Sequence, residues 1–264
     1  MFRVVTSTSA RARISAAARL LERRSPEAEA LVVGASRGAA DDFARTVARQ
    51  FGATFGMTRF GLTELAARAA AVPMARSGRA PGTQAAMEAI AARAVFDVQA
   101  AGALTYLAPV AGMPGFPRAL ARTLHELRLA LVPAGRLASL QGSAADLGRL
   151  LEQVGHEVDR FGLDDRADLL RVATSEWTAG RVRWCGLPVI LLDVPLDARV
   201  EQEFVAAVVS RAEEGVATVP AGDRRAIESW QALGFRVEVE ADEVPEAPDL
   251  THLRRYVFSN ERPP

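Results

Sequence analysis

Residues 31–44 read Leu-Val-Val-Gly-Ala-Ser-Arg-Gly-Ala-Ala-Asp-Asp-Phe-Ala, and this stretch decides the fold class. Three apolar residues predict a buried strand, and the segment from Gly34 to Gly38 predicts a tight turn. The spacing of Phe43, Val47 and Phe51, four residues apart, predicts a helix directly after the turn. Free backbone N–H groups and the dipole of such a helix favour an anion at its start.

The same alternation of strand and helix continues on both sides of this stretch. Upstream, the pattern predicts a strand over residues 2–6 and a helix over 10–23. Downstream it predicts a short strand over 53–59 and a helix from residue 63. The C-terminal part repeats the alternation, with strands expected at 187–193, 215–220 and 235–239 and helices at 199–212, 223–233 and 250–258.

Helical patterns predominate between these two parts. A Pro/Gly-rich linker is expected over residues 73–82, followed by helices over 83–94 and after the loop 109–117, and by helices from Ser143 and from Asp164 or Asp165. We therefore expect an α/β core made from residues 1–70 and 181–264, interrupted by an all-helical insertion over residues 71–180.

Composition excludes several classes of protein. The 264-residue chain is 49% hydrophobic with a net charge of zero, which suits a sizeable core and gives no global attraction to nucleic acid. No apolar run is long enough to cross a membrane, and a single cysteine, Cys185, excludes an internal disulfide. All 32 basic residues are arginine, so no mechanism that requires a lysine amine is open to this chain. The first 21 residues favour a strand and a helix over a transit peptide.

The turn after the first buried stretch fits two enzyme motifs. Gly34, Ser36 and Gly38 match G-x-S-x-G, the nucleophile elbow of serine hydrolases, and Asp193 and His252 complete the chain order of a triad. However, no oxyanion loop precedes the turn, and His252 falls in an expected helix. The turn also looks like that of NAD(P)-dependent short-chain dehydrogenases, but Ala40 stands where a third glycine is needed. The Tyr-x-x-x-Lys pair of that family is impossible without lysine.

A third match is the P-loop, G-x-x-x-x-G-K-[ST], which starts at Gly34. Ala39 replaces its second glycine, Ala40 its lysine and Asp41 its hydroxyl residue. The lysine binds the β- and γ-phosphates and the hydroxyl binds Mg²⁺. A P-loop in this position is therefore inactive.

The arrangement of the whole chain resembles the N-terminal region of AddB/RexB-type subunits of bacterial helicase–nuclease complexes, which are PD-(D/E)XK nuclease family proteins. The resemblance is carried by LVVGASRGAADDFAR (31–45), FGMTRFGLTELAARAA (55–70) and, most specifically, LTYLAPVAGMPGFPRALARTLHELRLA (104–130). DLGRLLEQVGHEVDRFGLDDRADLLRVA (146–173), VILLDVPLD (189–197) and VATVPAGD (216–223) extend it. It implies a P-loop NTPase-like parallel sheet of the UvrD-type helicase kind, with an all-helical insertion.

The resemblance also implies a function, and it shows which catalytic residues of an active helicase this sequence lacks. In an active helicase the strand of residues 189–192 would end in Asp-Glu, but Val194 follows Asp193 here. Gly34, Ser36, Arg37, Gly38 and Asp193 are then vestigial nucleotide-site positions, and we expect no catalytic residue, cofactor or metal. The nuclease motif of that family lies outside this chain. The resemblance implies a cytoplasmic protein with a role in DNA repair and recombination. This chain would be its non-catalytic domain, which contacts single-stranded DNA and an AddA-type helicase–nuclease subunit and has no membrane partner.

Single-stranded DNA is held by cations on phosphates and aromatic rings on bases. Arg59 with Phe60, and Phe116 with Arg118 and Arg122, are the candidate DNA contacts. Core packing is favoured for Trp177 and Trp184, a helix start for Asp223, and exposed helix positions for His125-Glu126 and His156-Glu157, which lack a third metal ligand. The alternatives are an enzyme using the turn, as a serine hydrolase or NAD(P) oxidoreductase, and a small-molecule-binding α/β protein without a DNA role.

Overall fold

The computed structural model describes residues 2–25, 27–52 and 56–240. The expected helix over 250–258, with His252, lies outside these residues, as does the first part of the strand expected over 53–59. The described residues form two compact units. The sheet unit comprises residues 2–59, 189–194 and 214–240, and the helical unit comprises residues 60–188 and 195–213. The helical unit thus includes segments on both sides of the expected insertion.

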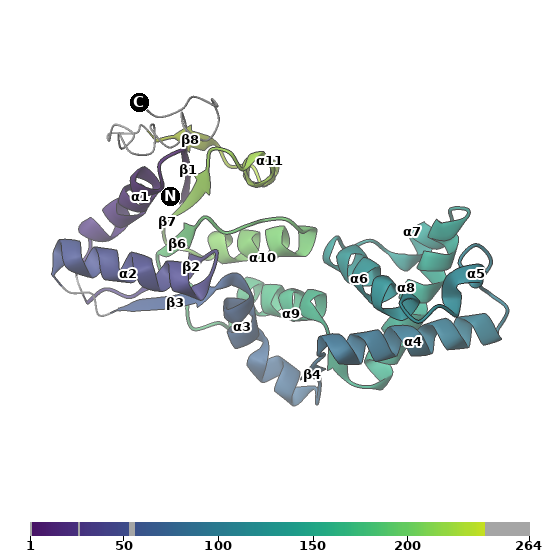
Figure 1. The fold of residues 1–264 in the computed structure, drawn as a ribbon. Coiled ribbons are helices and arrows are strands. Elements are labelled where there is room, and N and C mark those ends of the chain that lie inside the picture. Colours follow the sequence, from purple (N-terminus) through teal and green to yellow (C-terminus); the bar gives the residue numbers. More distant parts are fainter. Residues whose placement is uncertain (1, 26, 53–55, 241–264) are drawn as a thin grey trace, which may run out of the picture. The chain divides into compact units, whose positions relative to one another are not determined.

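Across the described residues the strands form a six-stranded sheet in the order β3-β2-β6-β7-β1-β8, and its described registers are parallel (Figure 1). The strands are β1 (Phe2–Ser7), β2 (Ala30–Gly34), β3 (Met57–Gly61), β6 (Val189–Leu192), β7 (Gly215–Pro220) and β8 (Val237–Val239). The α/β class and the parallel sheet expected from the sequence are confirmed. Strand β3 lies a few residues later than expected.

One face of this sheet packs against α1 (Ala10–Glu22) and α2 (Arg37–Phe51). Phe43 and Val47 of α2 are buried with Val32 of β2 and Ile190 of β6, as the four-residue spacing predicted. Phe51 instead lies partly exposed at the end of the helix. Within the described residues, the sheet unit also contains α11 (Arg224–Ala232), and Asp223 caps it, as expected.

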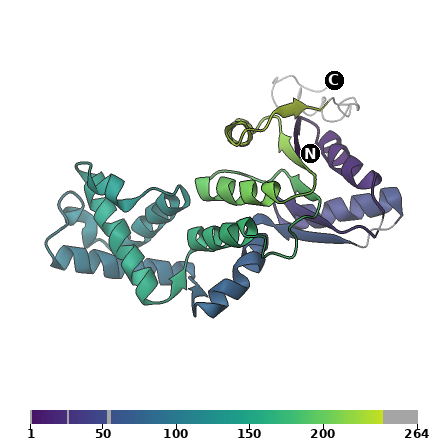
Figure 2. The ribbon, with the colours of Figure 1, turned by 180° about the vertical axis from the view of Figure 1, so that it is seen from behind.

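The helical unit contains the remaining described helices and a short parallel pair of strands (Figures 1 and 2). These elements are α3 (Leu62–Arg76), β4 (Ala80–Pro81), α4 (Gln84–Ala100), α5 (Ala108–Ala111), α6 (Phe116–Leu129), α7 (Ala134–Ala138), α8 (Ser143–Arg160), β5 (Leu163–Asp164), α9 (Arg166–Thr178) and α10 (Arg199–Ser210).

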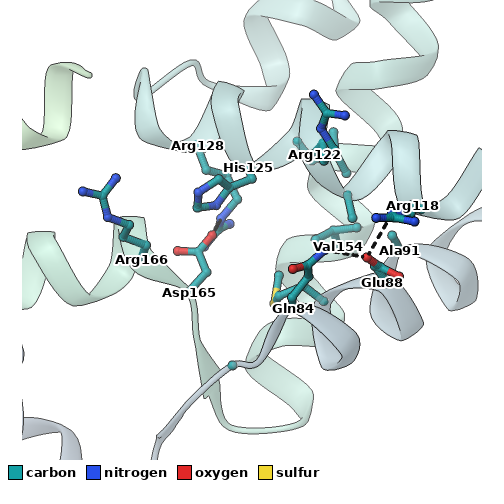
Figure 3. A pocket seen from close by; sticks show the side chains of 14 residues that line it. Gln84, Glu88, Ala91, Arg118, Arg122, His125, Arg128, Val154, Asp165 and Arg166 are labelled. Carbon is teal, nitrogen blue, oxygen red and sulfur yellow. Dashed lines mark hydrogen bonds and ion pairs between the residues drawn. The ribbon is translucent and has the colours of Figure 1, made fainter. Parts of the chain in front are cut away.

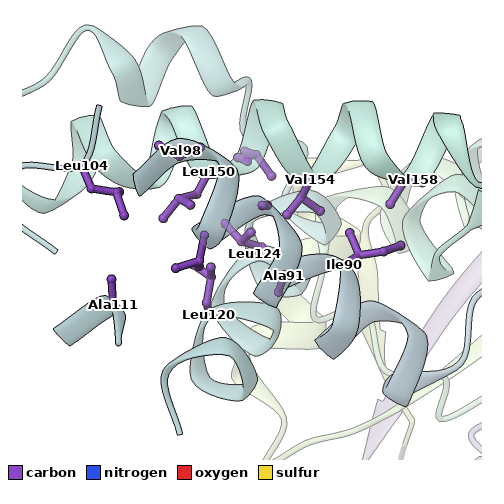
Figure 4. Close-up of a cluster of buried hydrophobic side chains, with 13 residues drawn as sticks. Ile90, Ala91, Val98, Leu104, Ala111, Leu120, Leu124, Leu150, Val154 and Val158 are labelled. Carbon is purple, nitrogen blue, oxygen red and sulfur yellow. The ribbon is translucent and has the colours of Figure 1, made fainter. Parts of the chain in front are cut away.

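Two apolar clusters stabilise the helical unit. In the first, α4, α6 and α8 bury their inward faces, with Leu120, Leu124, Leu150 and Val154 at the centre (Figure 4). In the second, α9 packs between α3 and α10, and α9 and α10 lie side by side in both views (Figures 1 and 2). Each buried aliphatic side chain contributes about 1.5–3 kcal/mol.

The second cluster is built around aromatic rings. Trp177 is fully buried, stacks on Trp184 with ring centroids 6.4 Å apart, and meets Phe204 edge-on at 6.0 Å. The prediction of core packing for both tryptophans is confirmed. Aromatic pairs in these geometries contribute more than their buried area alone.

Two details of the helical part differ from expectation. The linker expected over residues 73–82 begins later, after Arg76, because α3 continues through Pro73 and buries Met74. Proline near the end of a helix removes one backbone hydrogen bond, and here packing against α9 outweighs that loss. Ser143 is not a cap either: Gly142, with φ of 68°, occupies the cap position and Ser143 is already helical.

Candidate functional site

The carboxyl ends of β2, β6 and β7 lie next to one another at one edge of the sheet. Gly34 is in register with Leu192, and Leu192 with Thr218. The turn after Gly34 and the aspartate after Leu192 therefore lie at the same edge, where open parallel sheets bind their ligands. The structure brings the expected nucleotide-site positions of the sheet unit together.

The turn after β2 is short and closed. Strand β2 ends at Gly34 and α2 begins at Arg37, so that only Ala35 and Ser36 connect them. A Cβ on Gly34 would lie 2.6 Å from the carbonyl oxygen of Ser36 and 2.9 Å from the backbone nitrogen of Ala40. Glycine is thus required by the close approach of the first turn of α2. A P-loop holds four residues between its glycines to surround a phosphate, and no such loop is formed here.

Ser36 acts as the cap of α2. Its hydroxyl accepts a hydrogen bond from the backbone N–H of Ala39 at 3.2 Å, and its φ and ψ of −142° and 163° are ordinary extended values. A nucleophile elbow holds its serine in a strained turn. Asp193 and Leu131 are the described non-glycine residues with positive φ, and Ser36 is not among them. This geometry does not favour a serine nucleophile.

Asp193 is held by a dense set of contacts directly after β6. Its backbone N–H donates to the hydroxyl of Thr218 at 3.0 Å, and that hydroxyl donates to the Asp193 carboxylate at 2.7 Å. Arg13 of α1 adds a bidentate ion pair, from Nε to Oδ1 and from Nη2 to Oδ2, both at 3.0 Å. The Arg13 side chain is 10% exposed and that of Asp193 33% exposed.

Arg13 also donates to the carbonyl oxygen of Ser7 at 2.7 Å, so the guanidinium joins the ends of β1 and β6. The Arg13 guanidinium thus satisfies both carboxylate oxygens of Asp193. Val194, which follows Asp193, is buried and offers no second acid. Among the described residues, this sheet edge therefore carries a completed ion pair between Arg13 and Asp193.

Asp41 lies in the first turns of α2 and is shared by two arginines. Arg37 approaches its carboxylate at 3.3 Å and Arg59 at 3.5 Å. Arg59, a candidate DNA contact, thus has an acidic neighbour within the sheet unit. An acid in this position repels a phosphate that would otherwise bind the start of α2.

The two candidate aromatic contacts to DNA are engaged in packing. Phe60 is 7% exposed and meets the ring of Trp184 edge-on, with centroids 5.0 Å apart. Phe116 packs partly buried against the cluster of α4, α6 and α8. Phe60 is therefore a core side chain, whereas Phe116 keeps part of its ring exposed.

Arg118 and Arg122, by contrast, are exposed on α6 and line a cavity of about 390 Å³ in the helical unit (Figure 3). We call this cavity the α4–α6 groove; its walls are the start of α4, one face of α6 and the start of α9. Gln84 and Glu88 line it from α4, His125 and Arg128 from α6, and Asp165 and Arg166 from the start of α9.

The sequence predictions did not include several of these residues. His125 was expected to be an exposed helix residue and is instead half-buried in the groove wall, while Glu157 is buried and pairs with Arg160 at 3.6 Å. Arg13 was not singled out, although it shares the buried face of α1 with Ala16 and Ala17. A single arginine on an otherwise apolar helix face is the signal that predicts a buried partner carboxylate.

A search with protein-family models finds no match to the chain, and no curated protein sequence matches it. Within the described ranges, no group of three or more His, Cys, Asp or Glu side chains is placed to hold a metal ion. None of the helices between residues 2 and 240 that the structure describes is both long and apolar enough to cross a membrane.

Proposed function

We propose that the chain is a non-catalytic, UvrD-type helicase-like domain of an AddB-type DNA repair and recombination protein, and that it contacts single-stranded DNA and a helicase–nuclease partner subunit. The observation that carries this proposal is the sheet edge. Asp193, which the proposal assigns to the position of a Mg²⁺-binding aspartate, is paired with Arg13. The turn at Gly34 is too short to surround a phosphate.

The support is chemical as well as geometric. Helicases hydrolyse ATP with a lysine on the phosphates and an acid on the metal. This chain contains no lysine, and its aspartate is already paired within the sheet unit. A parallel sheet whose edge lacks this chemistry suits the proposed scaffold with a nucleic-acid surface.

An anisotropy titration with fluorescently labelled single-stranded DNA tests the proposal. Binding to phosphates releases counterions, so the affinity must fall as salt rises from roughly 50 to roughly 200 mM. Salt-sensitive binding of single-stranded DNA supports the proposal. Absence of binding at the lower salt concentration contradicts the DNA contact.

A Ser36→Ala variant separates this proposal from a serine hydrolase. Loss of the cap on α2 costs about 1 kcal/mol of stability, and DNA binding stays unchanged. An ester-hydrolysing activity of the wild-type protein that disappears in Ser36→Ala would instead favour the enzyme.

A further inference from the structure

The α4–α6 groove contains arginines with very different surroundings. Arg128 is mostly buried and pairs with Asp165 at 2.5 Å and with Asp168 at 2.6 Å. Burial opposes its charge, but these two carboxylates raise the pKa of Arg128 above its ordinary value. Arg166 pairs with Glu201 at 2.6 Å. These two arginines form part of the groove wall, and neighbouring carboxylates neutralise their charges.

Arg122 and Arg118 are available to a ligand. Arg122 has no ion-pair or hydrogen-bond partner among the described residues, and it extends from α6 away from the groove's carboxylates (Figure 3). Arg118 is 72% exposed, and its contact with Glu88 is long, at 3.8 Å. An exposed pair of this kind contributes little and is readily exchanged for a better anion.

The start of α4 also favours an anion. Gly82 and Gln84, at this helix start, line the groove. The N-terminus of α4, a helix of 17 residues, therefore meets the cavity, whereas the start of α9 is already capped by the Asp165 carboxylate. The dipole of α4 adds to the field of the unmatched Arg122 guanidinium.

The rest of the lining is aliphatic. Met87, Ala91, Leu124 and Val154 line the groove, and its described lining residues include no Phe, Tyr or Trp; the one ring is the imidazole of His125. Such a wall contacts a sugar but offers a base no large aromatic platform for stacking. The ligand that fits is one phosphate with its sugar, because one arginine is unmatched and one is weakly matched.

We propose that the α4–α6 groove binds a single sugar-phosphate unit, with Arg122 and Arg118 on the phosphate and Glu88 as its competitor for Arg118. The inference deepens the proposed function and rests on it for the source of the phosphate, a DNA strand. A free nucleotide offers the same chemistry and is the second source to be tested.

The experiment compares the wild-type protein with three single variants in the same titration against labelled single-stranded DNA. Arg122→Ala lowers the affinity roughly tenfold, because it removes charge-assisted hydrogen bonds to a phosphate. It also reduces the slope of log affinity against log salt by about 0.7, the value for one phosphate contact of a single strand.

The other two variants discriminate a site from general charge. Glu88→Gln raises the affinity roughly threefold, because Arg118 loses its competing carboxylate. Arg136→Ala is the matched control: Arg136 is an exposed arginine of α7 in the same unit, outside the groove lining, and its side chain has no partner among the described residues. It leaves the affinity unchanged. Equal losses in Arg122→Ala and Arg136→Ala, or no loss in either, overturn the inference.

Competition with a nucleoside monophosphate and with inorganic phosphate identifies the source of the ligand. If DNA binds the wild-type protein and Arg122→Ala equally, the groove inference fails while the proposed function stands. If DNA does not bind but the nucleoside monophosphate binds the wild-type protein and not Arg122→Ala, the groove site stands and the proposed function fails.

Discussion

The ion pair between Arg13 and Asp193 holds the sheet edge together, and a double-mutant cycle measures its strength. Arg13→Met keeps the aliphatic stem inside α1 and removes the charge. Asp193→Asn keeps a side chain that tolerates the positive φ of 49° at this position. The cycle therefore removes the interaction with little change to packing or backbone.

The contacts of Arg13 set the expected loss of free energy of unfolding. Arg13 makes a bidentate contact with the carboxylate and one hydrogen bond to Ser7. Breaking a fully buried pair costs about 3–5 kcal/mol, but Asp193 is a third exposed, which reduces the cost. We predict a loss of about 2–3 kcal/mol for Arg13→Met and a coupling energy of about 1.5 kcal/mol for the pair.

Hydrogen exchange at increasing urea, followed in peptides from β1 and β7, reports the free energy of unfolding of the sheet unit. The control cycle uses Arg45 and Asp42, an exposed pair on α2 with side chains 62% and 72% exposed, for which solvent screening leaves little measurable coupling. A coupling between Arg13 and Asp193 no larger than that of the control would refute the role of the pair.

Three further predictions concern the turn and the helical unit. Gly34→Ala destabilises the sheet unit by about 2 kcal/mol in urea unfolding, because the added Cβ would overlap backbone atoms. Gly38→Ala has little effect, because a Cβ there would lie no closer than 3.7 Å to another heavy atom. Equal effects of the two variants would contradict the close approach at Gly34. Asp146→Ala destabilises the helical unit by about 3 kcal/mol, because the backbone N–H groups of Thr105 and Leu107 lose their acceptor. Unchanged hydrogen-exchange protection of these two N–H groups would argue against this prediction. The midpoint temperature of unfolding of the helical unit is insensitive to pH near neutrality and falls as the pH drops below about 4. A midpoint that stays constant down to about pH 2 would contradict this prediction.

The sign of the last prediction follows from two buried carboxylates. Burial opposes the charge on both, yet backbone N–H groups from Leu107 and Thr105 lower the pKa of Asp146 below its ordinary 3.8. Arg128 and Arg171 lower the pKa of Asp168 in the same way. A carboxylate with a lowered folded-state pKa stabilises the fold above its unfolded value of 3.8. That stability is lost as pH falls through the folded-state pKa.

Local patterns were sufficient to predict the strands of the six-stranded sheet, with β3 a few residues displaced, and the turn, but not the short strands β4 and β5. The apolar run before Gly34, the cap at Asp165 and the strand over 215–220 are each defined by neighbouring residues, and each is found as expected. The parallel sheet follows from their alternation with helices.

Partners distant in sequence were not predictable in this way. Phe60 meets Trp184, and Arg13 meets Asp193, across more than a hundred residues each. An exposed aromatic contact and a packed ring have the same local pattern, so the sequence indicated Phe60 as a candidate DNA contact where the structure has a buried ring. Pro73 was expected to end a helix because tertiary packing of α3 cannot be read from its own residues.

The most direct measurement is calorimetric titration of the wild-type protein with ATP, with and without Mg²⁺. Because the ion pair between Arg13 and Asp193 occupies this sheet edge, we predict no heat of binding beyond that of dilution at millimolar ATP, with or without Mg²⁺. Mg²⁺-dependent binding of ATP that Asp193→Asn abolishes would contradict it, because the aspartate would then hold a metal ion in place of the arginine.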